Sequence, residues 1–134
     1  MRIVLDTNCL IQSISPRSRY YAVWESLVGG QNTLCVSNEI IMEYLEILQR
    51  LTDYDTAETI IKTIINSKFV EFITPYYNFG LITQDPDDNK FVDCAIAADA
   101  EYIVTNDKHF EVLKETPWPK LLVINIKDFV AQIS

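Results

Sequence analysis

Ile3-Val4-Leu5-Asp6-Thr7-Asn8 is a short apolar run that leads directly into an acid and two small polar residues. A run of this length and composition predicts a buried strand. A second run of the same form, Tyr102-Ile103-Val104-Thr105-Asn106-Asp107, lies far along the chain. Functional groups in an open parallel sheet collect just beyond the carboxyl ends of the strands. We therefore expect Asp6 and Asp107 to lie together at one edge of a sheet.

The rest of the chain alternates between strand and helix patterns. Further strands are predicted at 33–36, 69–73 and 121–124. Helices are predicted at 20–28, 87–100, 108–114 and 127–133, and two more begin near Asn38 and Asp53. Strands that alternate with helices indicate a three-layer α/β domain with a mainly parallel, five-stranded sheet. No linker, repeat or low-complexity tract interrupts the sequence, so we expect residues 1–134 to form a single domain.

Composition limits the class of protein. Hydrophobic residues make up 49% and charged residues 22%, as in soluble globular proteins. No run approaches the about 18 consecutive apolar residues of a membrane helix, and the early charges of Arg2 and Asp6 argue against a signal peptide. The scattered Cys9, Cys35 and Cys94 match no metal-binding spacing and indicate a reducing compartment. We expect a cytoplasmic protein without a membrane partner.

Other acids lie in helix patterns that lead to the same edge. Glu43 borders the apolar stripe of the helix that begins near Asn38. Asp93 lies in the middle of the 87–100 helix, whose small alanines allow a close approach to the sheet. Asp85, Asp87 and Asp88 stand at the start of that helix, where one of them is explained as a cap. Any one of these acids, taken alone, can equally be a helix cap or a solvated charge.

Convergence of Asp6, Glu43, Asp93 and Asp107 would have a chemical consequence, because like charges a few ångströms apart cannot all ionise without compensation. Oxygen ligands of this kind bind hard divalent cations, Mg²⁺ or Mn²⁺, which activate water for in-line attack on a phosphate. The net charge of −8 and the pI of about 4.5 count against a nucleic-acid partner, since proteins that hold phosphates usually carry a basic face.

These segments resemble the motifs of the PIN-domain family of nucleases. The first motif is similar to Ile3-Val4-Leu5-Asp6-Thr7-Asn8, and the second to Ser37-Asn38-Glu39-Ile40-Ile41-Met42-Glu43-Tyr44. Asp93-Cys94-Ala95-Ile96-Ala97-Ala98 stands where the family has its third acid, and Thr105-Asn106-Asp107 resembles the fourth motif. Asp85-Pro86-Asp87-Asp88-Asn89 is similar to a VapC-like branch of small prokaryotic members, toxins of type II toxin–antitoxin pairs.

The resemblance implies a Rossmann-like fold, Mg²⁺- or Mn²⁺-dependent ribonuclease activity, a cognate antitoxin protein and a homodimer. It implies that Asp6, Glu43, Asp93 and Asp107 bind the metal and carry catalysis, with Asp88 as an auxiliary ligand. It also implies that four neighbouring polar residues orient those ligands: Thr7, Asn8, Thr105 and Asn106.

Basic and aromatic side chains supply candidate RNA contacts. Arg17 and Arg19 lie in a loop beside Tyr20, a combination that suits phosphates and unpaired bases, although a solvated loop explains it equally well. Lys90 and Lys108 each stand close in sequence to an expected ligand. The single histidine, His109, is expected at the surface, and Trp24 is expected in the core or at a dimer seam.

Three alternatives to a toxin ribonuclease stay open. A phosphatase with Asp6 as nucleophile usually needs a second acid two residues later, where this chain has Asn8. A binding module would keep the fold and use the acidic residues at the edge of the sheet to bind a basic peptide, such as an antitoxin arm. A PIN protein of ordinary RNA processing would share the chemistry but lack an antitoxin; a neighbouring gene for a small basic DNA-binding protein would favour the toxin.

Overall fold

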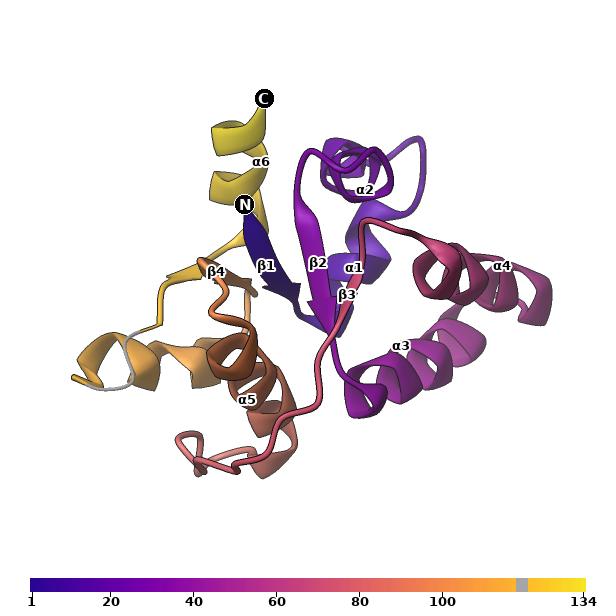
Figure 1. The fold of residues 1–134 in the computed structure, drawn as a ribbon. Coiled ribbons are helices and arrows are strands. Elements are labelled where there is room, and N and C mark those ends of the chain that lie inside the picture. Colours follow the sequence, from indigo (N-terminus) through magenta and orange to yellow (C-terminus); the bar gives the residue numbers. More distant parts are fainter. Residues whose placement is uncertain (118–120) are drawn as a thin grey trace.

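A five-stranded sheet with every strand parallel forms the centre of the protein, in a computed structural model that describes residues 1–117 and 121–134. The strand order is β3-β2-β1-β4-β5 (Figure 1). The strands are β1 (Arg2–Leu5), β2 (Thr33–Val36), β3 (Glu71–Phe72), β4 (Tyr102–Val104) and β5 (Val123–Ile124). The predicted three-layer α/β architecture with a parallel sheet is confirmed.

Helices connect successive strands throughout the described chain. Between β1 and β2 lie α1 (Thr7–Ser13) and α2 (Tyr21–Val28), and between β2 and β3 lie α3 (Asn38–Leu51) and α4 (Tyr54–Asn66). The later elements are η1 (Pro86–Asp88), α5 (Asn89–Ala98), η2 (Lys108–Glu115) and α6 (Ile126–Ile133). The predicted 108–114 helix is therefore a 3₁₀ helix, and the predicted 69–73 strand pairs only over two residues before Pro75.

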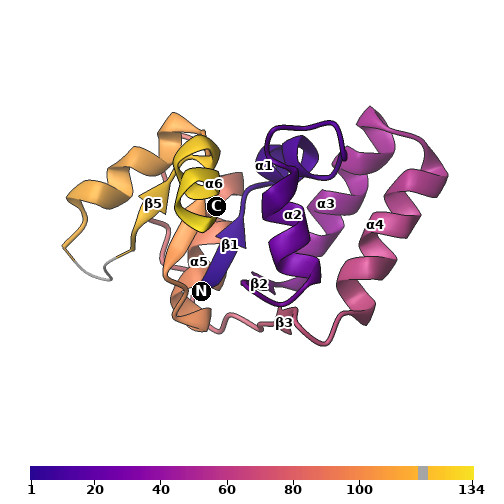
Figure 2. The same ribbon diagram turned by 90° about the horizontal axis from the view of Figure 1, so that it is seen from above.

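The chain changes its direction across the sheet after β3. From β1 it moves outward to β2 and β3, and it then returns past β1 to form β4 and β5. Because such crossovers are right-handed, the reversal puts α5 on the opposite side of the strands from α1 and α2 (Figures 1 and 2). The carboxyl ends of β1 and β4 flank the point of reversal, which is where open α/β sheets bind ligands.

The core fills both sides of this sheet. Ile3, Val4 and Leu5 of β1 are fully buried, as expected for a strand covered on both faces. The three cysteines and Trp24 are buried among the apolar side chains. Among the described residues, no helix has the length and apolar character needed to cross a membrane.

Tyr44 of α3 connects this helix to the carboxyl end of β1. Its ring is fully buried, and its hydroxyl donates to the carbonyl oxygen of Leu5, the residue before Asp6. Ser37 begins the helix by accepting a hydrogen bond from the Ile40 N–H at 3.3 Å. The register of α3 against β1 is therefore fixed by a polar contact as well as by apolar packing.

We predict that Tyr44→Phe lowers the free energy of unfolding by about 1–2 kcal/mol, because the buried Leu5 carbonyl is deprived of its side-chain donor. Urea denaturation would measure the change. Tyr54→Phe is the control, since that side chain belongs to a residue that is 65% exposed and removal of its hydroxyl should be neutral. Equal effects of the two changes would contradict the role of the Tyr44 hydroxyl.

Candidate metal centre

The parallel pairing of β1 with β4 brings Asp6 and Asp107 to the same edge of the sheet. The pairing continues beyond β1, where the Asp6 N–H donates to the Val104 carbonyl at 3.0 Å. The Thr105 hydroxyl donates to Asp6 Oδ2 at 2.7 Å and accepts from the Asp107 N–H at 3.0 Å. One hydroxyl thus connects both acids, as the expected convergence at the strand ends requires.

Glu43 reaches the same cluster from α3. The hydroxyl of Thr7, the residue after Asp6, donates to Glu43 Oε2. The Lys90 ammonium of α5 lies 2.7 Å from Glu43 Oε1, and the lysine side chain is only 10% exposed. The Glu43 carboxylate therefore has a buried counter-charge within the protein itself.

Asp88 supplies the third acid of the cluster, at the N-terminus of α5. Burial, followed by the charges of Asp85, Asp107 and Asp6 in that order, raises the pKa of Asp88 to about 7, against a lowering effect of the neighbouring His109. Burial also raises the pKa of Asp6, as do the charges of Asp107 and Glu43, against the lowering effect of its bond from Thr105. Asp6, Glu43, Asp88 and Asp107 thus act on one another electrostatically.

Asp93 is not brought into this cluster. Its carboxylate accepts from the Phe79 N–H at 3.1 Å, and after burial the charge that raises its pKa is that of Glu39. The reason is geometric: α5 runs away from the strand ends, so Asp93 lies about 7.5 Å further along the helix and about 140° around it from Asp88. Asp88, expected only as an auxiliary ligand, stands where Asp93 was expected.

Asp93 instead holds the irregular segment 73–85 against α5. Asn89 adds a second attachment, since its side chain accepts from the Ile82 N–H at 2.9 Å and donates to the Ile82 carbonyl at 2.8 Å. Two side chains of α5 therefore satisfy backbone groups of a segment that has no regular secondary structure.

The neighbouring polar residues divide into two groups. Thr7 and Thr105 donate directly to site carboxylates, as expected. Asn106 accepts from the Ile126 N–H at 3.1 Å and so connects the end of β4 to α6. Asn8 is exposed, and within the described part of the chain no hydrogen bond joins its side chain to these acids.

The candidate RNA-binding residues are placed differently from one another. Arg17 is exposed in the loop after α1, and the Arg19 guanidinium lies 5.9 Å from the centre of the Tyr20 ring. Lys108 borders an open cavity beside Asp107. Lys90 is occupied by its ion pair with Glu43, so it serves the cluster rather than a solvent-facing phosphate site.

His109 was expected at the surface, but the structure turns its ring toward the acids. Its Nδ1 atom lies 3.4 Å from Asp107 Oδ1 and 3.5 Å from Asp88 Oδ2. The cause is local: the Asp107 carboxylate caps η2 by accepting from the His109 N–H at 2.9 Å, which holds the side chain beside it. The spacing of two residues from Asp107 is the sequence feature that could have indicated this.

The residues present suit a divalent cation. Carboxylate oxygens are the ligands that Mg²⁺ and Mn²⁺ prefer. Here they come from Asp6 directly after β1, Glu43 in α3, Asp88 in η1 at the start of α5, and Asp107 directly before η2. Asp88 Oδ2 is buried and has no hydrogen-bond partner among the described residues, although an ionised oxygen in that position needs one. A cation between these acids would compensate both the repulsion and the missing hydrogen bond.

Comparisons with known proteins agree with this architecture. A family model described as PIN domain matches residues 2–109. The structure of VapBC2 from Rickettsia felis bound to a promoter DNA fragment contains a chain that is 20% identical, with a TM-score of 0.64 over 93% of this chain and 98% of that one.

VapBC-1 from nontypeable Haemophilus influenzae gives 17% identity and a TM-score of 0.63 over 95% of this chain and 99% of that one. The PIN domain endonuclease Utp24 is 14% identical, with a TM-score of 0.54 over 92% of this chain and 84% of that one. A comparison with curated protein sequences gives no match. At these identities the solved structures establish similarity of fold.

We predict that Asp88→Asn stabilises the metal-free protein at alkaline pH. Because the folded-state pKa is raised, the ionised carboxyl costs stability, and this cost grows as the pH rises from the ordinary 3.8 through about 7. At pH 8 the variant should therefore melt about 2–5 °C above wild type in EDTA, with the difference shrinking toward pH 4.

The matched control for this melting experiment is Asp87→Asn, which removes the same charge from a side chain that is 85% exposed. It should leave the pH dependence of the melting temperature unchanged. A lower melting temperature for Asp88→Asn at pH 8 would show that the Asp88 carboxylate is stabilised in the folded protein, contrary to the prediction.

Proposed function

The chain belongs to the PIN-domain family, and from this premise we propose that it is a metal-dependent endoribonuclease. The observation that carries the proposal is the convergence of Asp6, Glu43, Asp88 and Asp107 from four separate elements. A structural protein gains nothing from such a cluster, because each carboxylate raises the cost of ionising the next. A nuclease needs it to hold a cation against a phosphate.

The proposed roles follow from the hydrogen bonds and ion pairs of these residues. Mg²⁺ or Mn²⁺ held by these four acids supplies a Lewis acid that activates water and neutralises charge on a scissile phosphate. Thr105 and Thr7 fix the orientation of Asp6 and Glu43 through their hydroxyl groups. Lys90 supplies the counter-charge of Glu43. Burial is the largest influence on the pKa of Lys90 and lowers it, but the hydrogen bonds and charges of Glu43 and Asp87 together outweigh burial and raise the pKa.

A groove beside Asp107 offers a path for the RNA strand. This cavity, of about 470 Å³, is bordered by Tyr20 and three lysines, Lys108, Lys114 and Lys127, together with Glu111 and Asp128. Phosphates would contact the lysines, and an unpaired base would stack on the ring of Tyr20. The three lysines balance Asp107, Glu111 and Asp128 along this lining, so the groove repels RNA less than the net charge of −8 over the whole chain would.

We also propose that the protein is the toxin of a type II toxin–antitoxin pair, with a cognate antitoxin protein as partner and a homodimer as its assembly. The motif segment 85–89 and the similarity to chains of two VapBC structures support this. A PIN protein of ordinary RNA processing is the second candidate, since the same fold occurs in Utp24, which is described as a PIN domain endonuclease. Growth arrest on expression, reversed by the product of the adjacent gene, separates the two.

The other two alternatives fit the site geometry less well. A covalent phosphatase needs a free nucleophile at Asp6, but Asp6 is only 7% exposed and its Oδ2 accepts from Thr105. A module that only binds a basic peptide has no need for Thr7 and Thr105 to orient individual carboxylates.

We predict that the protein cleaves single-stranded RNA with Mg²⁺ or Mn²⁺ and not in EDTA, and that Asp6→Asn or Asp107→Asn lowers the rate about 100-fold or more. Asp88→Asn should have the same effect, while Asp93→Asn keeps the rate within about threefold, since Asp93 bonds to the Phe79 backbone instead. Gel assays on a labelled RNA would measure the rates.

The pair of variants at 88 and 93 decides the ligand assignment in this assay. Abolished cleavage in Asp93→Asn with cleavage retained in Asp88→Asn would return the third ligand to Asp93. A phospho-aspartate trapped at Asp6 would support a phosphatase. If neither cation supports cleavage of RNA, the nuclease proposal is rejected in favour of a binding module.

We predict that Lys114→Ala and Lys127→Ala each weaken single-stranded RNA binding about threefold to fivefold at low salt, measured by fluorescence anisotropy in an Asp6→Asn background. Removing one lysine–phosphate interaction should also reduce the salt slope of log K by about 0.7. Lys62→Ala is the control, since Lys62 pairs with Glu58 on α4, outside the groove. Equal weakening by all three variants would exclude the groove as the RNA path.

A further inference from the structure

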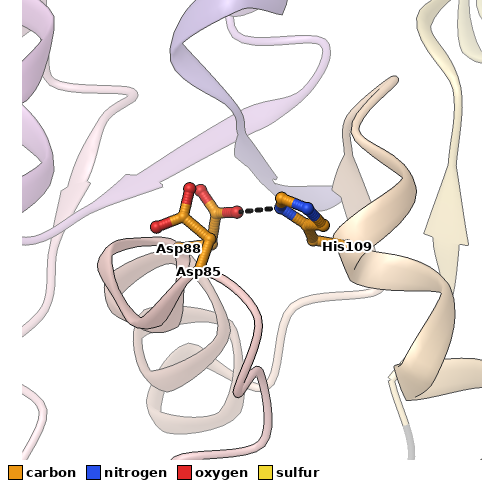
Figure 3. A group of neighbouring side chains, drawn as sticks. All are labelled: Asp85, Asp88 and His109. Carbon is orange, nitrogen blue, oxygen red and sulfur yellow. Dashed lines mark ion pairs between the residues drawn. The ribbon is translucent and has the colours of Figure 1, made fainter.

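Asp85, Asp88 and His109 offer one ligand atom each within 4.8 Å of one another (Figure 3). Figure 3 shows the two carboxylates side by side at the turn before α5, with the Asp88 carboxylate directed at the imidazole of His109. Asp85 caps η1 by accepting from the Asp87 N–H at 3.2 Å, which holds its carboxylate at this turn. The cluster therefore brings a nitrogen donor to an otherwise all-oxygen site.

Two atoms of this group are buried without a hydrogen-bond partner among the described residues: Asp88 Oδ2 and His109 Nδ1. They face each other across 3.5 Å, which is long for a hydrogen bond between nitrogen and oxygen. A buried polar atom without a hydrogen-bond partner costs free energy. Two such atoms that face the same small space would both be satisfied by an ion bound between or beside them.

The dimensions of the group suit a metal ion. Ligand atoms bound at about 2.1 Å from one ion lie about 3 to 4 Å apart, close to the 3.5 Å between His109 Nδ1 and Asp88 Oδ2, and Asp85 offers an oxygen within 4.8 Å of the other two ligand atoms. Asp88 and Asp107 also belong to the proposed catalytic cluster, so an ion here is bound at its rim rather than at a remote site.

We propose that His109 is a metal ligand through Nδ1, and that together with Asp85 and Asp88 it makes the centre select Mn²⁺ over Mg²⁺. Imidazole nitrogen binds first-row transition ions but is a poor ligand for Mg²⁺, which is bound through oxygen. The proposal rests on the proposed function and deepens it by naming the cofactor of the same site. The alternative is a simple ion pair between a protonated His109 and Asp88.

Mn²⁺ binding is measured on the full chain by electron paramagnetic resonance, from the decrease of the free-ion signal, and Mg²⁺ binding by its competition. We expect His109→Ala to weaken Mn²⁺ binding about tenfold and Mg²⁺ binding less than about twofold. Pulsed measurements on the wild type should show nitrogen coupling to bound Mn²⁺, and this coupling should vanish in the variant.

His109→Asn and a pair of aspartate variants protect the experiment against a folding defect. The Asn side chain puts an amide near the position of Nδ1, so the fold should survive while the nitrogen ligand is removed. Asp85→Asn should weaken Mn²⁺ binding and keep the cap of η1, whereas Asp87→Asn, the same charge change on an exposed neighbour, should not weaken it. Circular dichroism of each metal-free variant checks the fold.

The proposal is overturned if no nitrogen coupling appears in the wild type, or if the ratio of Mn²⁺ to Mg²⁺ affinity is unchanged in both His109 variants. This failure is distinct from failure of the nuclease proposal. Mg²⁺-supported RNA cleavage with an unchanged affinity ratio would reject the histidine ligand and keep the nuclease. Nitrogen coupling without RNA cleavage would keep the ligand and reject the nuclease.

Discussion

Parallel pairing between β1 and β4 is the constraint on which the candidate centre depends. It aligns the ends of two strands that are distant in the sequence, and the Thr105 hydroxyl then bridges Asp6 and the backbone of Asp107. Glu43 and Asp88 are added by the helices α3 and α5, which pack against the same strands. Without this register the acids would be dispersed over the surface, where each would be an ordinary solvated charge.

The cluster is divided into a neutralised half and an uncompensated half. Glu43 has the buried ammonium of Lys90, so its charge is balanced within the protein. Asp6 and Asp88 have raised pKa values, and Asp88 Oδ2 has no partner among the described residues. The uncompensated half, which also faces His109, is therefore the side from which a cation gains most.

The sequence predicted the strands, the parallel sheet and the placement of Asp6 and Asp107, because apolar runs and acids directly after them are local patterns. Glu43 was expected in the cluster through the resemblance to the PIN-domain motifs, since its position at the border of an apolar stripe suits a solvated charge equally well. It could not separate Asp88 from Asp93, since both lie in one acidic helical segment and the choice depends on which end of α5 meets the strand ends. The ion pair of Lys90 with Glu43 and the approach of His109 to Asp88 join distant segments, and no spacing in the chain reveals such pairings. The contact of His109 with Asp107 is local, and its spacing of two residues could have indicated it.

The attachment of segment 73–85 to α5 has an evolutionary consequence. Asn89 and Asp93 bind its backbone atoms and the buried Ile82 side chain packs into the core, so the exposed side chains of the segment are not what holds it in place. Tyr76 and Tyr77 are 88% and 75% exposed on this tethered stretch. Mutation of these tyrosines can therefore change the outer face of the segment while Asp88, at the start of α5, keeps its position beside His109.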